Sequence, residues 1–126
     1  MPYLLDTHVA LWVLKGEPIS SIAKEILDDV TEAIYVSIAS AWEIAIKIST
    51  DKLKYTGGVR AFLDDIKQND FIFLDVKESH IEAVENLEYH HRDPFDRLLI
   101  AAAKTEGLTI ITADENIQKY DVAFAW

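Results

Sequence analysis

The chain has 126 residues, half of them hydrophobic, which predicts one globular domain spanning residues 1–126 with a core of its own. It contains no cysteine, which excludes disulfides, thiolate zinc sites and cysteine nucleophiles and suits a reducing cytoplasm. With 22 acidic and 12 basic residues the formal net charge is −10, which does not favour a nucleic-acid partner but is compatible with carboxylates gathered around a divalent cation.

In chain order, the apolar and polar residues predict strands that alternate with helices. Strands are predicted at residues 3–5, 33–37, 71–76 and 108–112, with a short last strand at 122–125. Helices are predicted at residues 9–18, 20–30, 37–50, 59–67, 78–87 and 93–107, followed by a turn or one helical turn at 113–120. Asp6 and His8 interrupt the short apolar run at the N-terminus, so neither a signal peptide nor a membrane span is predicted.

The predicted strands are continuous apolar runs, a pattern typical of parallel sheets covered on both faces. We therefore expect a three-layer α/β/α sandwich with a mostly parallel sheet of four to five strands. In such sheets ligands bind beyond the carboxyl ends of the strands. Asp6 and Asp114 follow the first and fourth strands. Glu43 lies about two turns into the helix after the second strand, and Asp96 lies in the first turn of the helix before the fourth. These four acids are expected to converge at that edge.

Each acid also has a structural interpretation. Asp6 can cap the following helix, and Asp114 taken alone fits an ordinary Asx turn. Glu43 and Lys47 are four residues apart and can form a helix-surface ion pair worth roughly 0.2–0.5 kcal/mol. However, the helix around Glu43 is apolar on nearly all sides, which predicts a buried helix in which a glutamate needs a partner or a metal.

The segment "HHRDPFDRLLIAAA" contains two aspartates with different expected roles. Asp93 precedes a proline and is the best candidate in the chain for a helix N-cap. Asp96 lies three and four residues before Leu99 and Ile100, on the apolar stripe of the helix. An acid placed only to favour the helix dipole would face water. We therefore predict that Asp93 is the cap and that Asp96 has a chemical function.

Several carboxylates at one edge repel one another unless they share protons or bind a cation. Carboxylates without cysteine or paired histidines favour Mg²⁺ or Mn²⁺ over zinc, and such an ion suits attack of water on a phosphodiester. Most histidines such as His8, His90 and His91 are packing or loop residues, so they are weaker candidates for ligands or bases. Trp12, Trp42 and Trp126 are predicted to be core or dimer contacts.

Four segments, "LLDTHVALW", "SIASAWEIAIK", "HHRDPFDRLLIAAA" and "ITAD", occur in an order and spacing that resemble the PIN-domain ribonucleases, most of all the VapC-type toxins of toxin–antitoxin pairs. The resemblance runs from Leu5 to about Asp121. It implies the α/β/α fold and metal-dependent hydrolysis of RNA by water, leaving 5′-phosphate and 3′-hydroxyl ends. It also implies a homodimer and a small VapB-like antitoxin that inserts a peptide into the active-site groove.

The resemblance also implies which residues are functional. The acids expected to bind Mg²⁺ or Mn²⁺ and to be catalytic are Asp6, Glu43, Asp96 and Asp114. Asp93 matches a family position that supports the site. From their positions near these acids, Thr7 is expected to orient a ligand or water, while Lys47 and Arg97 are expected to neutralise carboxylates, meet phosphate or form structural ion pairs.

Two other functions stay open. A phosphotransfer domain of the receiver type also has an acid after its first strand, but it needs a neighbouring acid that Asp6 lacks and a phosphate-accepting aspartate after the third strand, where Asp75 stands. A non-catalytic module of the same fold would use its acidic surface to bind a basic partner. The complete set of acids argues against this second alternative.

Overall fold

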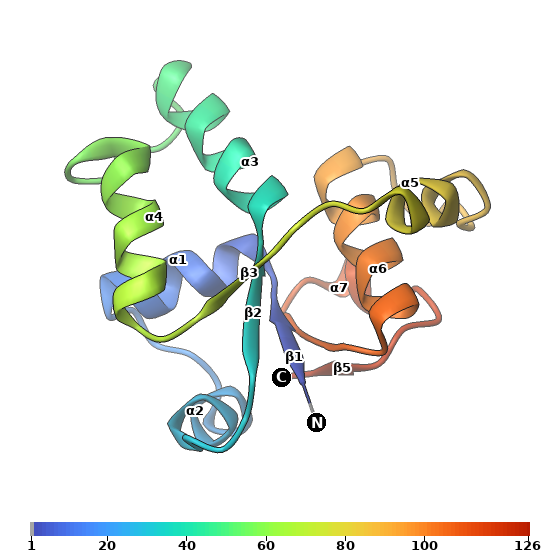
Figure 1. The fold of residues 1–126 in the computed structure, drawn as a ribbon, viewed down its shortest axis with the longest axis horizontal. Coiled ribbons are helices and arrows are strands. Elements are labelled where there is room, and N and C mark those ends of the chain that lie inside the picture. Colours follow the sequence, from blue (N-terminus) through green and yellow to red (C-terminus); the bar gives the residue numbers. More distant parts are fainter. Residues whose placement is uncertain (1) are drawn as a thin grey trace.

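The computed structural model describes residues 2–126, which form one sheet of five parallel strands in the order β3–β2–β1–β4–β5 (Figure 1). The strands are β1 (Tyr3–Leu5), β2 (Ile34–Ser37), β3 (Ile72–Leu74), β4 (Thr109–Ile111) and β5 (Phe124–Ala125). The helices are α1 (Thr7–Lys15), α2 (Ser21–Asp28), α3 (Ile38–Ser49), α4 (Gly58–Gln68), α5 (Glu78–Glu85), α6 (Pro94–Glu106) and α7 (Glu115–Gln118). The predicted order of strands and helices is confirmed.

Strand β1 lies at the centre of the sheet and supplies both hydrophobic cores. Leu4 and Leu5 are fully buried, and because successive side chains of a strand point to opposite faces, they enter different cores. Leu5 packs with α1, α3 and α4 residues such as Ile44 and Phe62, whereas Leu4 packs with α6 residues such as Ile100. Figure 1 shows α1, α3 and α4 on one side of the sheet and α5 and α6 on the other, as predicted for a three-layer sandwich.

The register of β1 and β4 decides which residues meet at the carboxyl edge. The two strands are parallel neighbours, and Leu5 lies opposite Ile111. The residues that follow them, Asp6 and Thr112, therefore leave the sheet side by side. Helix α1 begins at Thr7, two residues earlier than predicted, because Asp6 caps it immediately after the strand.

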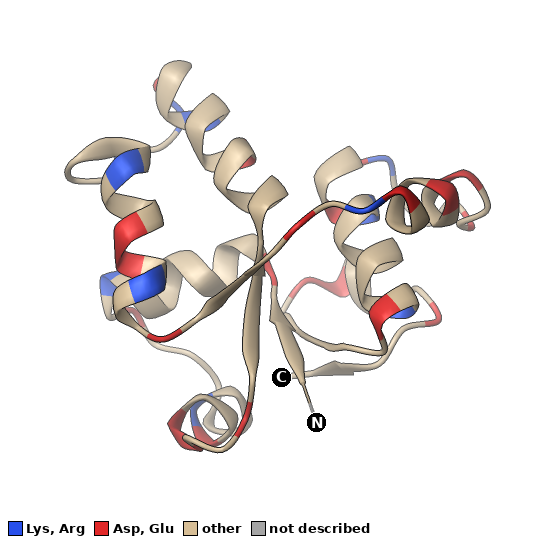
Figure 2. Ribbon diagram, in the orientation of Figure 1, with Lys and Arg blue, Asp and Glu red and all other residues tan. Residues whose placement is uncertain are grey.

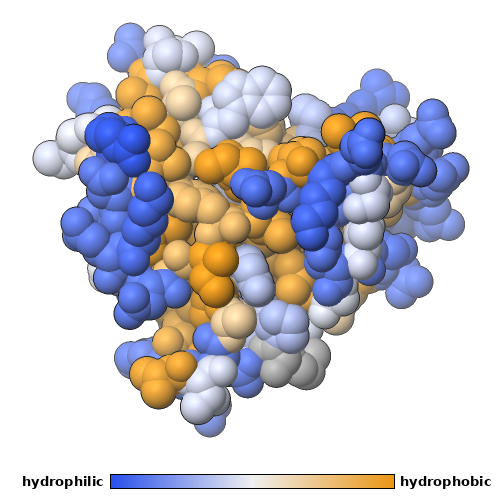
Figure 3. All heavy atoms as spheres, viewed as in Figure 1, coloured by the Kyte–Doolittle hydropathy of each residue, from blue (hydrophilic) through white to orange (hydrophobic). Residues whose placement is uncertain are grey.

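Helix α3 corrects one prediction. Its apolar sequence predicted a buried helix, and Glu43 is indeed buried, but residues Ile38, Trp42 and Ile46 are 38%, 63% and 38% exposed. These residues are four positions apart and form one stripe, because α4 and α6 contact the other sides of the helix. Figure 3 shows hydrophobic residues at the surface of the face in view, over the middle of the molecule. Among residues 2–126, no helix has the length and apolar character needed to cross a membrane.

Candidate functional site

Thr112 joins two of the predicted acids at the carboxyl edge. The Asp6 backbone N–H donates to the Ile111 carbonyl at 3.0 Å, which keeps Asp6 beside β4. The Thr112 hydroxyl donates to Asp6 Oδ2 at 2.8 Å and accepts the Asp114 backbone N–H at 3.0 Å. Thr112 is fully buried. Sequence reasoning missed this residue, although its place at the end of a strand and two positions before Asp114 was a usable signal.

Three of the predicted aspartates are helix caps in the structure. Asp93 accepts the Asp96 backbone N–H at 3.0 Å at the start of α6, so its predicted role as a cap is confirmed. Asp6 accepts the His8 N–H at 3.2 Å, and Asp114 accepts the Asn116 N–H at 2.8 Å. Each cap uses one carboxylate oxygen and leaves lone pairs on the other, so capping and cation binding are compatible at the same residue.

Glu43 is a buried carboxylate with one oxygen unsatisfied. The residue is 4% exposed; its Oε2 lies 3.0 Å from Lys47 Nζ, whereas Oε1 has no hydrogen-bond partner among residues 2–126. The buried hydroxyls of Thr7 and Ser40, 2.7 Å apart, join the start of α1 to α3 nearby. A buried acceptor without a partner costs roughly 1–3 kcal/mol, and more when it is charged. A cation at Oε1 would remove this cost.

Asp96 lies in the first turn of α6 with its side chain turned inward and only 15% exposed. The pKa of this carboxyl is raised to about 6, mainly by burial, while the hydrogen bond from His91 acts in the opposite direction. The negative charges of Asp93, Asp6 and Asp114 contribute smaller parts of this rise. Asp96 therefore feels the charges of Asp6 and Asp114, and a cation among these groups would favour its ionised form.

His8 connects Asp6 with the Glu43 side of the edge. Its ring Nδ1 lies 3.8 Å from Asp6 Oδ1. The contact with Asp6 is the main cause that raises the pKa of His8, and Glu43 adds a smaller effect of the same sign while Lys47 opposes it. Asp6 thus interacts with His8 and Thr112, and its charge acts on Asp96. However, no three His, Asp or Glu side chains in residues 2–126 are arranged so that they could hold a metal ion as they stand.

A buried network fixes the loop that precedes α6. Arg97, which is 4% exposed, donates from Nη1 to the Glu88 carbonyl at 2.9 Å and to the Tyr120 hydroxyl at 3.0 Å. Its Nη2 donates to the Leu87 carbonyl at 3.1 Å. Arg97 forms no ion pair with any carboxylate of residues 2–126, so the expectation of a carboxylate partner is corrected. Its charge anchors a loop because a guanidinium can satisfy several carbonyls at once.

His91 links this network to Asp96. Its Nδ1 lies 2.8 Å from the Tyr120 hydroxyl, and its Nε2 lies 3.0 Å from Asp96 Oδ2. The Tyr120 oxygen accepts an N–H from Arg97, and its one proton faces both the His91 carbonyl at 3.3 Å and His91 Nδ1. An ionised Asp96 carboxylate can only accept, so in the bond between them His91 Nε2–H is the donor. Sequence reasoning favoured a packing or loop role for His91 over a role as ligand or base, and it missed Tyr120, which lies 29 residues away in the sequence.

Asp75, the candidate phosphate acceptor of a receiver-type domain, lies away from Asp6. It is exposed after the edge strand β3, and β2 separates that strand from β1, so Asp75 does not join Asp6.

The tryptophans were predicted to be core or dimer contacts. Trp12 and Trp126 pack with ring centroids 5.7 Å apart. Trp42 instead packs on Phe95 at 5.2 Å and remains largely exposed, so it is not part of the core.

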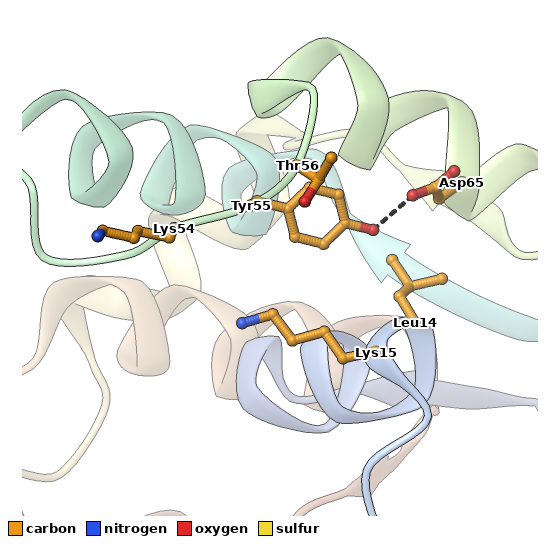
Figure 4. Close-up of a pocket in the computed structure, with 6 residues that line it drawn as sticks. All are labelled: Leu14, Lys15, Lys54, Tyr55, Thr56 and Asp65. Atoms are coloured by element: carbon orange, nitrogen blue, oxygen red, sulfur yellow. Dashed lines mark hydrogen bonds between the residues drawn. The ribbon is translucent and has the colours of Figure 1, made fainter.

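A separate cavity of about 400 Å³ lies between the end of α1, the loop after α3 and α4. Figure 4 shows its six lining residues, with Tyr55 at the centre and Lys15 and Lys54 extending along one side. The Tyr55 hydroxyl donates to Asp65 Oδ2 at 2.5 Å. Burial, followed by this bond to Asp65, raises the pKa of Tyr55. The cavity contains none of the predicted acids, and the Tyr55–Asp65 bond ties the loop to α4.

Comparison with known proteins identifies the relatives of this chain. A sequence model described as the PIN domain matches residues 3–123, and no curated protein sequence matches. The fold is similar to VapBC2 from Rickettsia felis bound to a promoter DNA fragment, with TM-score 0.75, 17% identity and coverage of 99% of this chain and 98% of that chain. It is also similar to DNA-bound VapBC from Salmonella typhimurium, with TM-score 0.73, 13% identity and coverage of 99% and 97%.

A third similar structure is described as a member of the VapBC family of toxin–antitoxin systems. It is VapBC-5 from Mycobacterium tuberculosis, with TM-score 0.62, 18% identity and coverage of 98% of this chain and 95% of that chain. At these identities the structural similarity establishes the fold alone. The sequence match over residues 3–123 extends from β1 to the residue before β5, so it includes every acid of the carboxyl edge.

Proposed function

The chain belongs to the PIN domain family, and on that premise we propose that it is a metal-dependent endoribonuclease that acts as the toxin of a cytoplasmic toxin–antitoxin pair. The observation that carries the proposal is the unsatisfied buried oxygen of Glu43 at an edge where Asp6, Asp96 and Asp114 also gather. Without a cation these carboxylates repel one another, and their oxygens are the ligands that Mg²⁺ and Mn²⁺ prefer.

The donor set fits such an ion. Asp6, Glu43, Asp96 and Asp114 would hold Mg²⁺ or Mn²⁺ through carboxylate oxygens once their side chains turn toward a common ion. When bound, the ion lowers the pKa of a water molecule and offsets the charge on a phosphate oxygen. Hydrolysis then adds the water oxygen to phosphorus and breaks the bond to the 3′ oxygen, which leaves a 5′-phosphate and a 3′-hydroxyl.

The surrounding residues have positioning roles in this proposal. Thr112 orients Asp6, and His91 orients Asp96, because each donates a hydrogen bond to one carboxylate oxygen. Asp93 supports the site as the cap that sets where α6 begins, and hence where Asp96 points. Lys47 neutralises Glu43 through its ion pair, and Thr7 with Ser40 holds α1 against α3 and orients the ligands nearby.

The proposal is tested by cleavage of a labelled RNA by purified protein with Mg²⁺, with Mn²⁺ and with a chelator. We expect cleavage with either ion, none with the chelator, and recovery when Mg²⁺ is added in excess. Asp96→Asn should cut at least roughly ten times more slowly than wild type, because it removes one charge from the site. Equal rates for the wild type and Asp96→Asn would overturn the assignment.

Calorimetric titration with millimolar Mg²⁺ separates this function from a non-catalytic binding module. We expect the wild-type protein to bind Mg²⁺ and to gain thermal stability, because a ligand that binds only the folded state stabilises it. Absence of Mg²⁺ binding would make a non-catalytic binding module the favoured function.

We further propose two protein partners. One similar structure is described as a member of the VapBC family of toxin–antitoxin systems, which supports a small VapB-like antitoxin as the partner that silences this site. The exposed stripe of Ile38, Trp42 and Ile46 supports a homodimer contact through α3. Trp42→Ser should therefore lower the dimer fraction of the isolated protein in sedimentation, whereas an unchanged dimer fraction would place the contact elsewhere.

A further inference from the structure

Tyr89 is an exposed aromatic ring held in a fixed orientation. It lies in the segment between α5 and α6, and it is 77% exposed. One face of the ring nevertheless packs on Arg97, whose guanidinium carbon is 3.8 Å from the ring centroid. Arg97 is itself buried and held by the carbonyls of Leu87 and Glu88 and by Tyr120. The ring therefore rests on an immobile cation, with its other face available to a ligand.

The same loop lines a cavity beside the predicted acids. Tyr89, His90, His91 and Arg92 line a space of about 650 Å³, which falls within the range of roughly 300–1,000 Å³ typical of small-molecule sites. His91 at this cavity also contacts Asp96 Oδ2 at 3.0 Å, so one side chain connects the cavity to the carboxyl edge. A nucleotide in the cavity would lie next to the proposed cleavage site.

Charge in this region favours stacking over general electrostatic attraction. Arg92 is exposed and forms no ion pair or hydrogen bond with any of residues 2–126, so it is available to a phosphate. Figure 2 shows, however, that acidic residues dominate α5, which precedes the loop. The Glu88 carboxylate lies 3.4 Å from His90 Nε2 and adds to the negative charge. Apart from Arg92, this surface offers little electrostatic attraction to the phosphates of an RNA strand. Base stacking, in contrast, does not depend on the net charge.

We propose that Tyr89 is the stacking platform for one base of a single-stranded RNA and that Arg92 contacts a phosphate of the same strand. Proteins bind single-stranded RNA by placing splayed bases on aromatic rings, and every base has a face that can stack. A base on the open face of Tyr89 would complete a stack of base, phenol ring and guanidinium. This inference rests on the proposed ribonuclease function and adds to it the element that positions the strand beside Asp96.

The experiment measures binding of a fluorescein-labelled single-stranded RNA of mixed sequence by anisotropy, with chelator present so that no strand is cut. Tyr89→Ala should weaken binding roughly 5- to 150-fold, the range that stacking of one base supplies, and Tyr89→Phe should bind within about twofold of the wild type. Tyr89→Leu keeps an apolar side chain over Arg97 without a π face, so it should bind as weakly as Tyr89→Ala while the fold is retained.

Arg92→Gln should weaken binding. It should also make the slope of log K against log salt concentration less steep, by the amount that one phosphate contact contributes. The matched control is Lys67→Gln on α4, which removes another exposed cation without a partner in residues 2–126 and should leave binding unchanged. Equal affinity of Tyr89→Ala and the wild type overturns the inference, as does loss of binding in Tyr89→Phe. If the wild type neither binds nor cuts RNA, the ribonuclease function itself fails, which is a distinguishable result.

Discussion

Replacement of Asp6 by asparagine is expected to abolish growth arrest when the protein is expressed and to reduce RNA cleavage by the purified protein roughly 100-fold or more. Asp6 is 2% exposed, shares the Thr112 hydroxyl with the Asp114 backbone, and its charge acts on Asp96. Asparagine has the same size and is an equally good helix cap, so the side-chain oxygen can still accept the His8 N–H. The substitution removes the negative charge that a divalent cation needs, and such a cation supplies several kcal/mol of transition-state stabilisation.

The measurement is growth after induction together with the rate of cleavage of a labelled RNA at saturating Mg²⁺. The free energy of unfolding of metal-free Asp6→Asn should fall by no more than about 1–3 kcal/mol, because the cap is retained while the Thr112 hydroxyl loses its acceptor, Asp6 Oδ2. Glu115→Gln is the matched control, since it removes an exposed negative charge adjacent to Asp114 in the sequence and should not alter either readout. Growth arrest by Asp6→Asn as strong as that by the wild type would contradict a catalytic role for this edge.

Replacement of Arg97 by methionine is expected to lower the free energy of unfolding by about 3–5 kcal/mol. Methionine keeps much of the length and apolar stem, but it offers no donor to the Leu87 and Glu88 carbonyls or to the Tyr120 hydroxyl. Hydrogen bonds from a charged group are worth roughly 1.5–3 kcal/mol each, and water can replace part of this loss at the two partly buried carbonyls. Arg97→Lys should recover only a fraction, because one ammonium cannot reproduce the planar set of donors.

Urea unfolding followed by circular dichroism measures this change. The control is Arg60→Met on α4, where Arg60 Nη2 lies 2.9 Å from Asp64 Oδ1 in an ion pair whose side chains are 65% and 51% exposed. Exposed pairs of this kind contribute roughly 0–1 kcal/mol, so the control should change stability little. If Arg97→Met were no more destabilising than Arg60→Met, the buried network would not be what holds the loop before α6.

The positions of the proposed site residues could be predicted from the sequence to different degrees. Asp6 and Asp114 could be placed at one edge because parallel strands end together, and the cap at Asp93 depends only on the three residues that follow it. Glu43 could be identified as unusual because its helix is so apolar. The exposed stripe on α3 could not be predicted, since its residues are as apolar as those on the buried side.

The sequence by itself determined the order of strands and helices, the parallel sheet and the caps, because these depend on periodicity and on neighbours a few residues apart. Only the tertiary structure decided which distant side chains meet. Thr112 reaches Asp6 across 106 residues of sequence, and Arg97 reaches Tyr120 across 23. No local pattern encodes such pairs, because their separation is set by how β1, β4, α6 and the loop before α6 pack around shared cores. That packing turns an ordinary first-turn acid, Asp96, toward the other carboxylates and holds Tyr89 open to a ligand.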